Sequence, residues 1–305
     1  MEKPVYHIPA MLQECIDGLQ ISPSGTYVDV TFGGGGHSRA IMKQLGEGGR
    51  LFSFDQDLDA YANRIEDPRF TFVHSNFRYL TNFMRFHKVD KVDGILGDLG
   101  VSFHHFDEAE RGFSFRADAP LDMRMNRSAR VDAAQVVNTY TEEQLLRIMA
   151  DYGDMRRPMP IVRAILKARD NRPVMPTGQL LDVIRPLINP KQEKKELAQI
   201  FQALRIEVNG EMDALKRFLE STLEVLRPGG RLVVLTYHSL EDRMVKNFIK
   251  TGNTEGIVDK DFFGKVNTPW RQITKGAVAP SQEEIDRNPR SRSAKLRVAE
   301  LIVNV

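Results

Sequence analysis

Residues 33–36 are four consecutive glycines, and two aspartates, Asp55 and Asp98, follow them at spacings that suit a ligand site. Glycine has no Cβ, so it lets a ligand approach the backbone closely. Asp55 follows Gly35 by about 20 residues, where doubly wound folds place a carboxylate that accepts hydrogen bonds from ribose hydroxyls. Asp98 follows an apolar segment, at the expected end of another strand. Together these residues predict a site for a ligand that contains ribose.

The glycine run alone does not identify this ligand. The dinucleotide pattern G-x-G-x-x-G is incomplete because Ser38 stands in place of the third glycine, and the sequence has no Gly-Lys-Ser/Thr phosphate loop. S-adenosylmethionine carries ribose and adenine without a pyrophosphate, so we favour a methyltransferase. The alternatives are a nicotinamide-dependent oxidoreductase, a non-catalytic RNA-binding factor and a tight turn that binds no ligand.

Strand and helix patterns alternate around these residues. Strands are expected at 27–31, 50–54, 70–74, 92–97 and 231–236, with a last strand at 295–303. Helices are expected at 11–19, from 39 onward, and at 58–65, 212–226 and 244–250. The segment between the last two strands, which contains Trp270, is expected to be irregular. This alternation predicts an α/β sheet whose carboxyl edge holds the glycine loop, Asp55 and Asp98.

The alternation stops between residues 103 and 205, where only helices are expected. Thr141 begins a capping-box pattern, and helices are predicted at 141–149, 161–168 and 180–187. A further apolar helical face consists of Leu197, Ile200, Phe201 and Leu204. We therefore expect an α/β domain in two parts, residues 1–104 and 207–305, with a helical domain inserted at 105–206.

Composition limits the class of protein. The 305 residues contain 43 Lys and Arg against 41 Asp and Glu, so any nucleic-acid surface must be a local patch. The single cysteine, Cys15, is expected in the core, and no Cys cluster indicates a metal site. The sequence has no apolar run long enough for a membrane span and no signal peptide, so a cytoplasmic location is expected.

Two segments have the composition of an RNA-binding surface. Aromatic residues alternate with arginines in the first, which contains Arg111, Phe113, Phe115 and Arg116. Packing of the inserted domain on the sheet is the alternative for this segment. The second is a basic run that contains Arg287, Arg290, Arg292, Lys295 and Arg297, and a solvated loop is its alternative.

Seven blocks, taken in this order, resemble the RsmH (MraW) family of methyltransferases, which modify the N4 amino group of a cytosine in bacterial 16S ribosomal RNA. The blocks are TFGGGGHS, FDQD, DGILGDLGVS, RGFSFRADAPLDMRM, RPGGRL, YHSLEDR and NPRSRSAKLRVAE. The resemblance extends over nearly the whole chain. It implies a Rossmann-like class I S-adenosylmethionine-dependent sheet with an inserted all-helical domain. Its implied partner is ribosomal RNA within a small subunit; the sequence does not decide between a monomer and a homodimer.

The resemblance also implies a set of cofactor-binding residues. These are Gly35, Gly36 and His37 in the loop, Asp55 at the ribose, Phe77 near the adenine, Asp98 near the methionine end, and a contact at residue 105. Here His105 replaces the usual glutamine, as part of VSFHHFD where VSSPQLD is typical. An imidazole can still form one hydrogen bond at that position.

Asp98 is also the candidate catalytic residue. A cytosine amino group is a poor nucleophile, and a carboxylate that accepts its hydrogens would favour a pyramidal nitrogen. His238 and Asp242 are weaker candidates, with a polar cluster that caps the following helix as the alternative.

Overall fold

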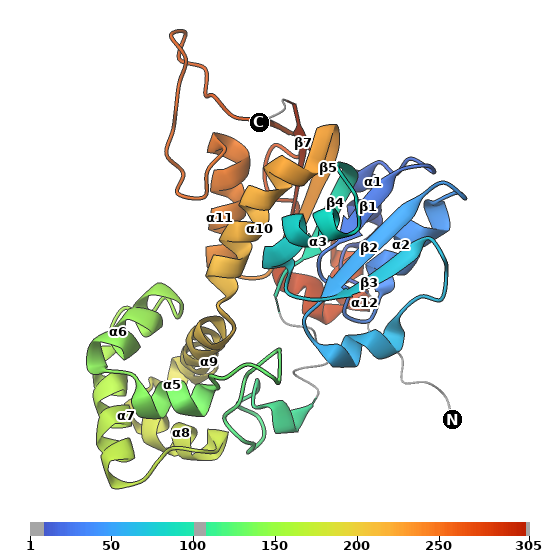
Figure 1. Ribbon diagram of the computed structural model, residues 1–305. Coiled ribbons are helices and arrows are strands. Elements are labelled where there is room, and N and C mark those ends of the chain that lie inside the picture. The colour runs from blue at the N-terminus through green and yellow to red at the C-terminus, as the bar shows by residue number, and fades with distance from the viewer. Residues whose placement is uncertain (1–8, 101–107, 303–305) are drawn as a thin grey trace. The chain divides into compact units, whose positions relative to one another are not determined.

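The computed structural model describes residues 9–100 and 108–302, and seven strands of these residues form one sheet (Figure 1). The strands are β1 (Thr26–Asp29), β2 (Arg50–Asp55), β3 (Phe70–His74), β4 (Val92–Asp98), β5 (Leu226–Thr236), β6 (Trp270–Gln272) and β7 (Lys295–Leu301). Their order is β3-β2-β1-β4-β5-β7-β6; β1 to β5 are parallel, and β7 is antiparallel to both neighbours.

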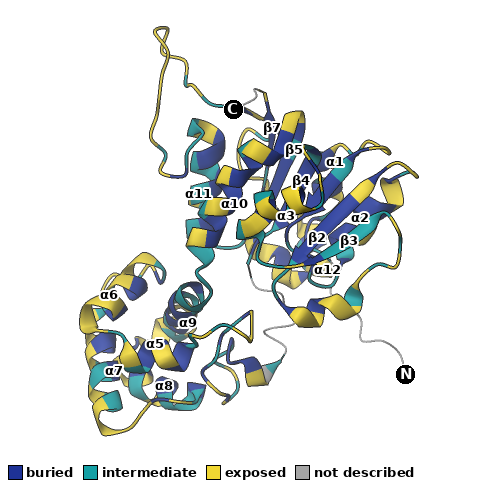
Figure 2. Cartoon of the chain, in the orientation of Figure 1, coloured by how far each residue is buried: buried dark blue, intermediate teal, exposed yellow. Residues whose placement is uncertain are grey.

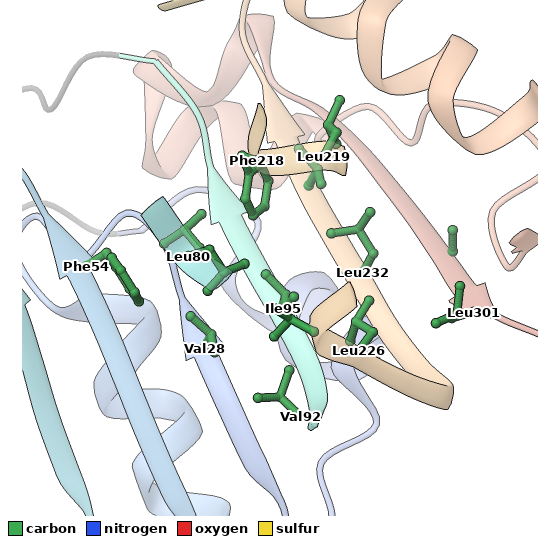
Figure 3. Packing of buried hydrophobic residues seen from close by; sticks show 14 of the residues in the cluster. Val28, Phe54, Leu80, Val92, Ile95, Phe218, Leu219, Leu226, Leu232 and Leu301 are labelled. Carbon is green, nitrogen blue, oxygen red and sulfur yellow. The ribbon is translucent and has the colours of Figure 1, made fainter. Parts of the chain in front are cut away.

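Alternation along the strands places one apolar layer on each face of the sheet. Ile95 belongs to the same buried cluster as Phe218, whereas its neighbour Leu96 belongs to the cluster that contains Cys15 (Figure 3 shows the first cluster). One face is covered by α1 (Leu12–Leu19) and α2 (Gly36–Gln44), and the other by α3 (Leu80–Phe86), α10 (Glu211–Val225) and α11 (Ser239–Thr251). The sheet is therefore doubly wound, and Cys15 is a core residue as expected.

The chain divides into two compact units, which we call the sheet unit (Met1–Gly100 with Met212–Val305) and the helical unit (Val101–Glu211). The helical unit contains α5 (Ala133–Thr139), α6 (Glu142–Asp151), α7 (Met159–Asn171), α8 (Thr177–Ile184) and α9 (Glu193–Asn209), and no strand occurs among its residues 108–211. Thr141 and Gln144 form the predicted capping box at α6. Leu197 and Leu204 of α9 are buried in the core of this unit, so the predicted apolar face is confirmed. The α/β fold class with an inserted helical segment is confirmed.

Some elements differ from the prediction. An α-helix was expected at 58–65, but the structure has the 3₁₀ helix η1 (Leu58–Asn63) there. Only Ala60 of this helix is buried, so it has too little packed apolar surface to stabilise a longer α-helix. β5 begins at Leu226, before the strand expected at 231–236, and its pairing with β4 is irregular there: Val92 aligns with Leu226, and Gly94 aligns with Arg231. The segment expected to be irregular contains β6 and α12 (Gln282–Arg287), both too short for a periodic pattern. The other short helices are η2 (Phe77–Tyr79), η3 (Ala109–Arg111), η4 (Arg185–Leu187), η5 (Pro190–Gln192) and η6 (Pro289–Ser293).

Candidate active site

The candidate site lies at the carboxyl edge of the parallel strands. β2, β1 and β4 are neighbours in the sheet, and they end at Asp55, Asp29 and Asp98 respectively. Parallel strands deliver their carboxyl ends to one edge, which is where open α/β sheets bind ligands. The structure thus brings the predicted Asp55 and Asp98 to the same edge as the loop that follows β1.

Asp55 holds the glycine loop through the backbone. Its Oδ2 accepts a 2.8 Å hydrogen bond from the amide of Gly33, and its Oδ1 accepts one of 2.8 Å from the amide of Asp57. Each carboxylate oxygen has a second lone pair, so Asp55 can still accept hydrogen bonds from a ligand. The side chain is partly exposed, which leaves that capacity accessible.

The glycines of the loop meet steric demands of the protein itself. Gly35 precedes α2 with a φ of 75°, and a Cβ there would lie 2.9 Å from the ring of Phe32. A Cβ on Gly36 would lie 2.8 Å from the side chain of Pro9. As in any α-helix, the first amides of α2 have no acceptor within the helix, so they are candidate donors to a ligand.

Asp98 lies at the centre of a polar network in which His37 is buried and Asp98 itself is partly exposed. Its amide donates a 2.7 Å hydrogen bond to Oγ1 of Thr31, and its Oδ1 accepts one of 2.7 Å from the hydroxyl of Tyr237. Its Oδ2 lies 3.8 Å from Nδ1 of His37. Burial raises the pKa of Asp98, against the opposing effects of His37 and of the Tyr237 hydrogen bond. Burial and the Asp98 charge likewise raise the pKa of Tyr237 well above its usual range.

His37 has a defined hydrogen-bonding role. Its Nε2 lies 3.1 Å from the carbonyl oxygen of Ala10, which can only accept, so Nε2 carries a proton. The other ring nitrogen, Nδ1, faces Oδ2 of Asp98 at 3.8 Å. His37 is buried, and it lies between the backbone of Ala10, just before α1, and the carboxylate of Asp98.

Asp29 is a member of this network that the sequence analysis missed. Its Oδ2 accepts a 2.6 Å hydrogen bond from Ser38, and its Oδ1 accepts one of 3.1 Å from the amide of Thr31. Since Ser38 gives its proton to Asp29, the hydroxyl of Ser53, 2.8 Å away, donates to Ser38. Burial raises the pKa of Asp29, and His37 and Ser38 oppose this rise. An acid inside the apolar run TYVDV was the available signal.

Phe77 begins η2, just after β3. Its ring packs on Phe218 with centroids 5.4 Å apart at 65°, and the side chain is partly exposed. The preceding Asn76 donates a 2.8 Å hydrogen bond to Oε1 of Gln56, which ties the ends of β3 and β2 together. One side of Phe77 is therefore core, and its contact with adenine stays a prediction.

Arg111, proposed from the sequence as an RNA contact, is buried in the helical unit. Its guanidinium donates hydrogen bonds of 2.8 and 3.2 Å to the backbone carbonyls of Arg124 and Met125, and it lies 3.5 Å from a carboxylate oxygen of Glu108. The structure therefore assigns Arg111 to holding its own loop rather than to an exposed surface.

The aromatic residues beside Arg111 also pack inside this unit. Phe113 is 4% exposed, and the ring of Phe115 packs on Phe201 at 5.5 Å. Arg116 is the exposed member of the predicted set. Both phenylalanines thus pack in the core of the helical unit itself. The alternative from the sequence, packing of the inserted domain on the sheet, stays a prediction.

The basic segment near β7 is partly neutralised by ion pairs. Arg297 Nε lies 2.8 Å from Asp242, Lys295 Nζ lies 3.3 Å from the same carboxylate, and Arg287 pairs with Glu284. Arg290 and Arg292 are exposed on η6. Burial tends to raise the pKa of Asp242, but the hydrogen bonds and charges of Arg297 and Lys295 outweigh it, so the pKa is lowered.

The weaker catalytic candidates have structural partners. Asp242 is held by the two cations just described, and Nε2 of His238 lies 3.1 Å from Oε1 of Glu241. Oε2 of Glu241 accepts a 2.9 Å hydrogen bond from the amide of Tyr237. This is the polar cluster at the start of α11 that the sequence offered as the alternative.

His105 lies outside the described residues.

Comparison with known proteins agrees with this geometry. The family model described as the MraW methylase family matches residues 4–302. The chain belongs to the MraW methylase family. The resemblance found in the sequence blocks is thereby confirmed, and the sheet-edge cluster of this methylase is the candidate place for its chemistry.

Curated relatives of this methylase are similar over nearly their whole length. A protein of Bacteroides thetaiotaomicron is 59% identical over 302 residues, which cover 98% of this chain and 99% of the relative. One of Parabacteroides distasonis is 58% identical over 298 residues (97% and 98%), and one of Porphyromonas gingivalis is 55% identical over 307 residues (99% and 98%). All three relatives are named ribosomal RNA small subunit methyltransferase H.

No helix of this methylase, within residues 9–100 and 108–302, is long and apolar enough to cross a membrane.

Proposed function

We propose that this methylase transfers a methyl group from S-adenosylmethionine to 16S ribosomal RNA of the small subunit, at the N4 amino group of a cytosine. The observation that carries the proposal is the joining of the Gly33 amide, Asp55 and Asp98 at one sheet edge in a chain of this family. The names of the relatives support the ribosomal substrate. The choice of N4 rests on the resemblance of the sequence blocks.

The residues present fit this cofactor. S-adenosylmethionine has a ribose diol, which donates hydrogen bonds, and a cationic methionine end. Asp55 has acceptor capacity for the diol, and the carboxylate of Asp98 suits a cationic group. Gly35, with a φ of 75°, makes the backbone turn before α2, and Gly36 and His37 are the first residues of that helix. Phe77 and His105 remain proposed contacts.

Asp98 is the residue we assign to the transfer step. The sulfonium supplies an already activated methyl group, so the protein chiefly has to orient the attacking nitrogen. Tyr237 donates to Oδ1 of Asp98, so Oδ2 is the oxygen proposed to accept a hydrogen bond from the amino group and to orient the nitrogen lone pair toward the methyl group. The same carboxylate would take up the proton that the nitrogen releases when it is methylated. The Thr31 hydroxyl, bonded to the Asp98 backbone, fixes the end of the strand.

We assign recognition of the RNA to two parts of the chain. The helical unit, with Arg116 exposed, is the proposed substrate-recognition domain, in the bounds 105–206 expected from the sequence. The proposed phosphate contacts in the sheet unit are Arg290, Arg292, Lys295 and Arg297. Arg297 also pairs with Asp242 through Nε, so it would contact a phosphate with the rest of its guanidinium group. The substrate in this proposal is RNA within a small subunit in the cytoplasm.

The test is methyl transfer from labelled S-adenosylmethionine to small ribosomal subunits from a strain that lacks this gene, with the nucleoside identified by mass spectrometry. N4-methylcytidine formed by the wild type and lost with Asp98→Ala would support the proposal. Asp90→Ala, an exposed carboxylate, is the matched control and should behave as wild type. A different methylated nucleoside would refute the N4 assignment, and no binding of S-adenosylmethionine would refute the reaction.

A further inference from the structure

Residues 253–268 form a loop that projects from the sheet unit between α11 and β6 (Figure 1). Its surface is almost entirely exposed (Figure 2). At its tip, Phe262 is 98% exposed and Phe263 is 90% exposed. Two adjacent, solvated phenylalanines are unusual, because such side chains are normally withdrawn from water.

The loop is a structured hairpin. Lys260 pairs with Val266 as an antiparallel bridge, and the amide of Asp261 donates a 2.9 Å hydrogen bond to the carbonyl of Lys265. Gly264 turns the chain with a φ of 80°. The base is held as well, since the hydroxyl of Thr268 donates a 3.2 Å hydrogen bond to the carbonyl of Ile249 in α11. The hairpin therefore presents its tip in a defined conformation.

The two rings contact each other rather than the body of the protein. Their centroids are 5.7 Å apart and their planes meet at 88°, an edge-to-face pair. With this geometry and these exposures, ring faces remain open to solvent. An open aromatic face is the group on which an unstacked nucleobase binds.

The tip carries two lysines, Lys260 and Lys265, and two acids, Asp259 and Asp261. Lys260 and Lys265 flank the phenylalanines and are exposed, and neither forms an ion pair with any residue in the described ranges 9–100 and 108–302. Both acids accept hydrogen bonds within the hairpin. Oδ1 of Asp261 accepts 2.9 Å hydrogen bonds from the amides of Phe263 and Lys265, and Oδ2 of Asp259 accepts one of 3.2 Å from the side-chain amide of Asn267. The lysines are thus the groups left to meet phosphates.

We propose that this hairpin is an RNA-contacting finger, in which Phe262 and Phe263 stack on unpaired bases of the substrate RNA while Lys260 and Lys265 contact its phosphates. This inference rests on the proposed function, since it takes ribosomal RNA as the substrate. It adds a binding surface that is separate in sequence from the glycine loop, from Asp98 and from the basic segment at 287–297.

The test compares four paired variants with the wild type. Phe262→Ala with Phe263→Ala removes the rings, and Phe262→Leu with Phe263→Leu keeps the apolar character without a π-face. Phe262→Tyr with Phe263→Tyr keeps both faces. Lys260→Gln with Lys265→Gln removes the charges. Phe86→Ala, which removes a 77% exposed phenylalanine at the end of α3, is the matched control.

The probes are a short single-stranded oligoribonucleotide and small ribosomal subunits that lack the modification, with dissociation constants measured by fluorescence. Stacking predicts that the Ala pair and the Leu pair weaken binding by about 5-fold to 150-fold for each base that stacks, whereas the Tyr pair and Phe86→Ala stay within about twofold of the wild type. The Lys variant should lower the slope of log affinity against log salt by about 1.4. Unchanged cofactor binding and thermal midpoints would show that folding is intact.

Two results with the RNA probes would overturn the finger. One is wild-type RNA affinity in the Ala pair. The other is wild-type affinity in the Leu pair, which would mean burial in an apolar pocket of a ribosomal protein rather than stacking. Anionic phospholipid vesicles serve as a third probe; binding that requires the rings there, without an RNA effect, would also overturn it. If the wild type transfers no methyl group to RNA, the proposed function fails, and oligoribonucleotide binding still decides on the finger.

Discussion

The hydroxyl of Tyr237 donates a 2.7 Å hydrogen bond to Oδ1 of Asp98, although the two residues are 139 positions apart in the chain. They come together because β4 and β5 are parallel neighbours, with Asp98 aligned with Leu235. The bond fixes the carboxylate in one orientation. It also favours the ionised form of a group whose pKa burial raises.

Tyr237→Phe should therefore impair methyl transfer most at low pH. Without the hydroxyl, the pKa of Asp98 rises further, so the acid limb of the pH–rate profile moves to higher pH. Since a hydrogen bond to a charged group contributes about 1.5–3 kcal/mol, turnover at neutral pH should fall by about tenfold or more. The measurement is kcat against pH, with S-adenosylmethionine affinity as the control. An unchanged profile would mean that Tyr237 has only a packing role.

The same variant should change how stability depends on pH. The folded-state pKa of Asp98 is raised above its unfolded value, so its contribution to stability is fully present below the unfolded pKa and is lost as pH rises through the folded pKa. Tyr237→Phe should accordingly be more destabilising at pH 8 than at pH 5. Urea unfolding at the two pH values measures this difference.

Asp55→Asn should weaken cofactor binding. The substitution replaces one acceptor oxygen with a donor and removes the charge, so it keeps at most one of the hydrogen bonds from the amides of Gly33, in the glycine loop, and Asp57. We expect the dissociation constant for S-adenosylmethionine to rise by about 10-fold to 100-fold in calorimetry. Asp59→Asn, an exposed carboxylate on η1, should leave it unchanged. Equal affinities of Asp55→Asn and the wild type would remove Asp55 from the cofactor site.

Ser38→Ala should destabilise the sheet unit. Buried Asp29 then loses its 2.6 Å hydrogen bond, and the hydroxyl of Ser53 loses its acceptor. The expected loss is about 1–3 kcal/mol in urea unfolding at neutral pH, and Ser24→Ala on the surface should cost less than about 0.5 kcal/mol. The loss should shrink at acid pH, because the pKa of Asp29 is already raised and its protonated form needs the bond less. A constant loss at all pH values would contradict this account.

Asp242→Asn should remove stability that depends on the ionised carboxylate. The lowered pKa of Asp242 means that its contribution is present above the unfolded pKa and is lost as pH falls through the folded pKa. Asp242 is 14% exposed and its partner Arg297 is 12% exposed, so we expect a loss of about 2 kcal/mol at pH 7 that disappears at low pH. Asp286→Asn, on the exposed side of α12, is the control. The measurement is the free energy of unfolding of the wild type and both variants, from chemical denaturation at pH 7 and pH 3.

The sequence predicted the parts of the fold that have a clear period. The alternating strands around Asp55 and Asp98 and the apolar face of α9 are present as expected, because burial on two faces or on one stripe leaves a pattern in the sequence. β6, with three residues, and η1, with one buried side chain, have too few residues to show such a pattern. Their conformation depends on neighbours that are distant in the chain.

The candidate site was predicted less completely for a similar reason. Asp55 and the glycine loop follow a spacing that is visible in one dimension, and the structure joins them. Tyr237 was overlooked beside His238, since only the pairing of β4 with β5 reveals its partner. Arg111 has the same composition signal whether it faces RNA or two backbone carbonyls inside the helical unit, so only three-dimensional packing distinguishes these roles.

The interruption of the sheet unit by the helical unit has a consequence for synthesis. A chain that emerges from its N-terminus completes β1 to β4 before the 110 or so residues of the helical unit, and β5 follows only afterwards. Until then the edge of β4 has no strand beside it, and the Asp98 carboxylate lacks the hydroxyl that orients it. The nascent chain must therefore shield an apolar strand edge while the helical unit is made. A methylase of this architecture acquires its proposed transfer site late in its own translation.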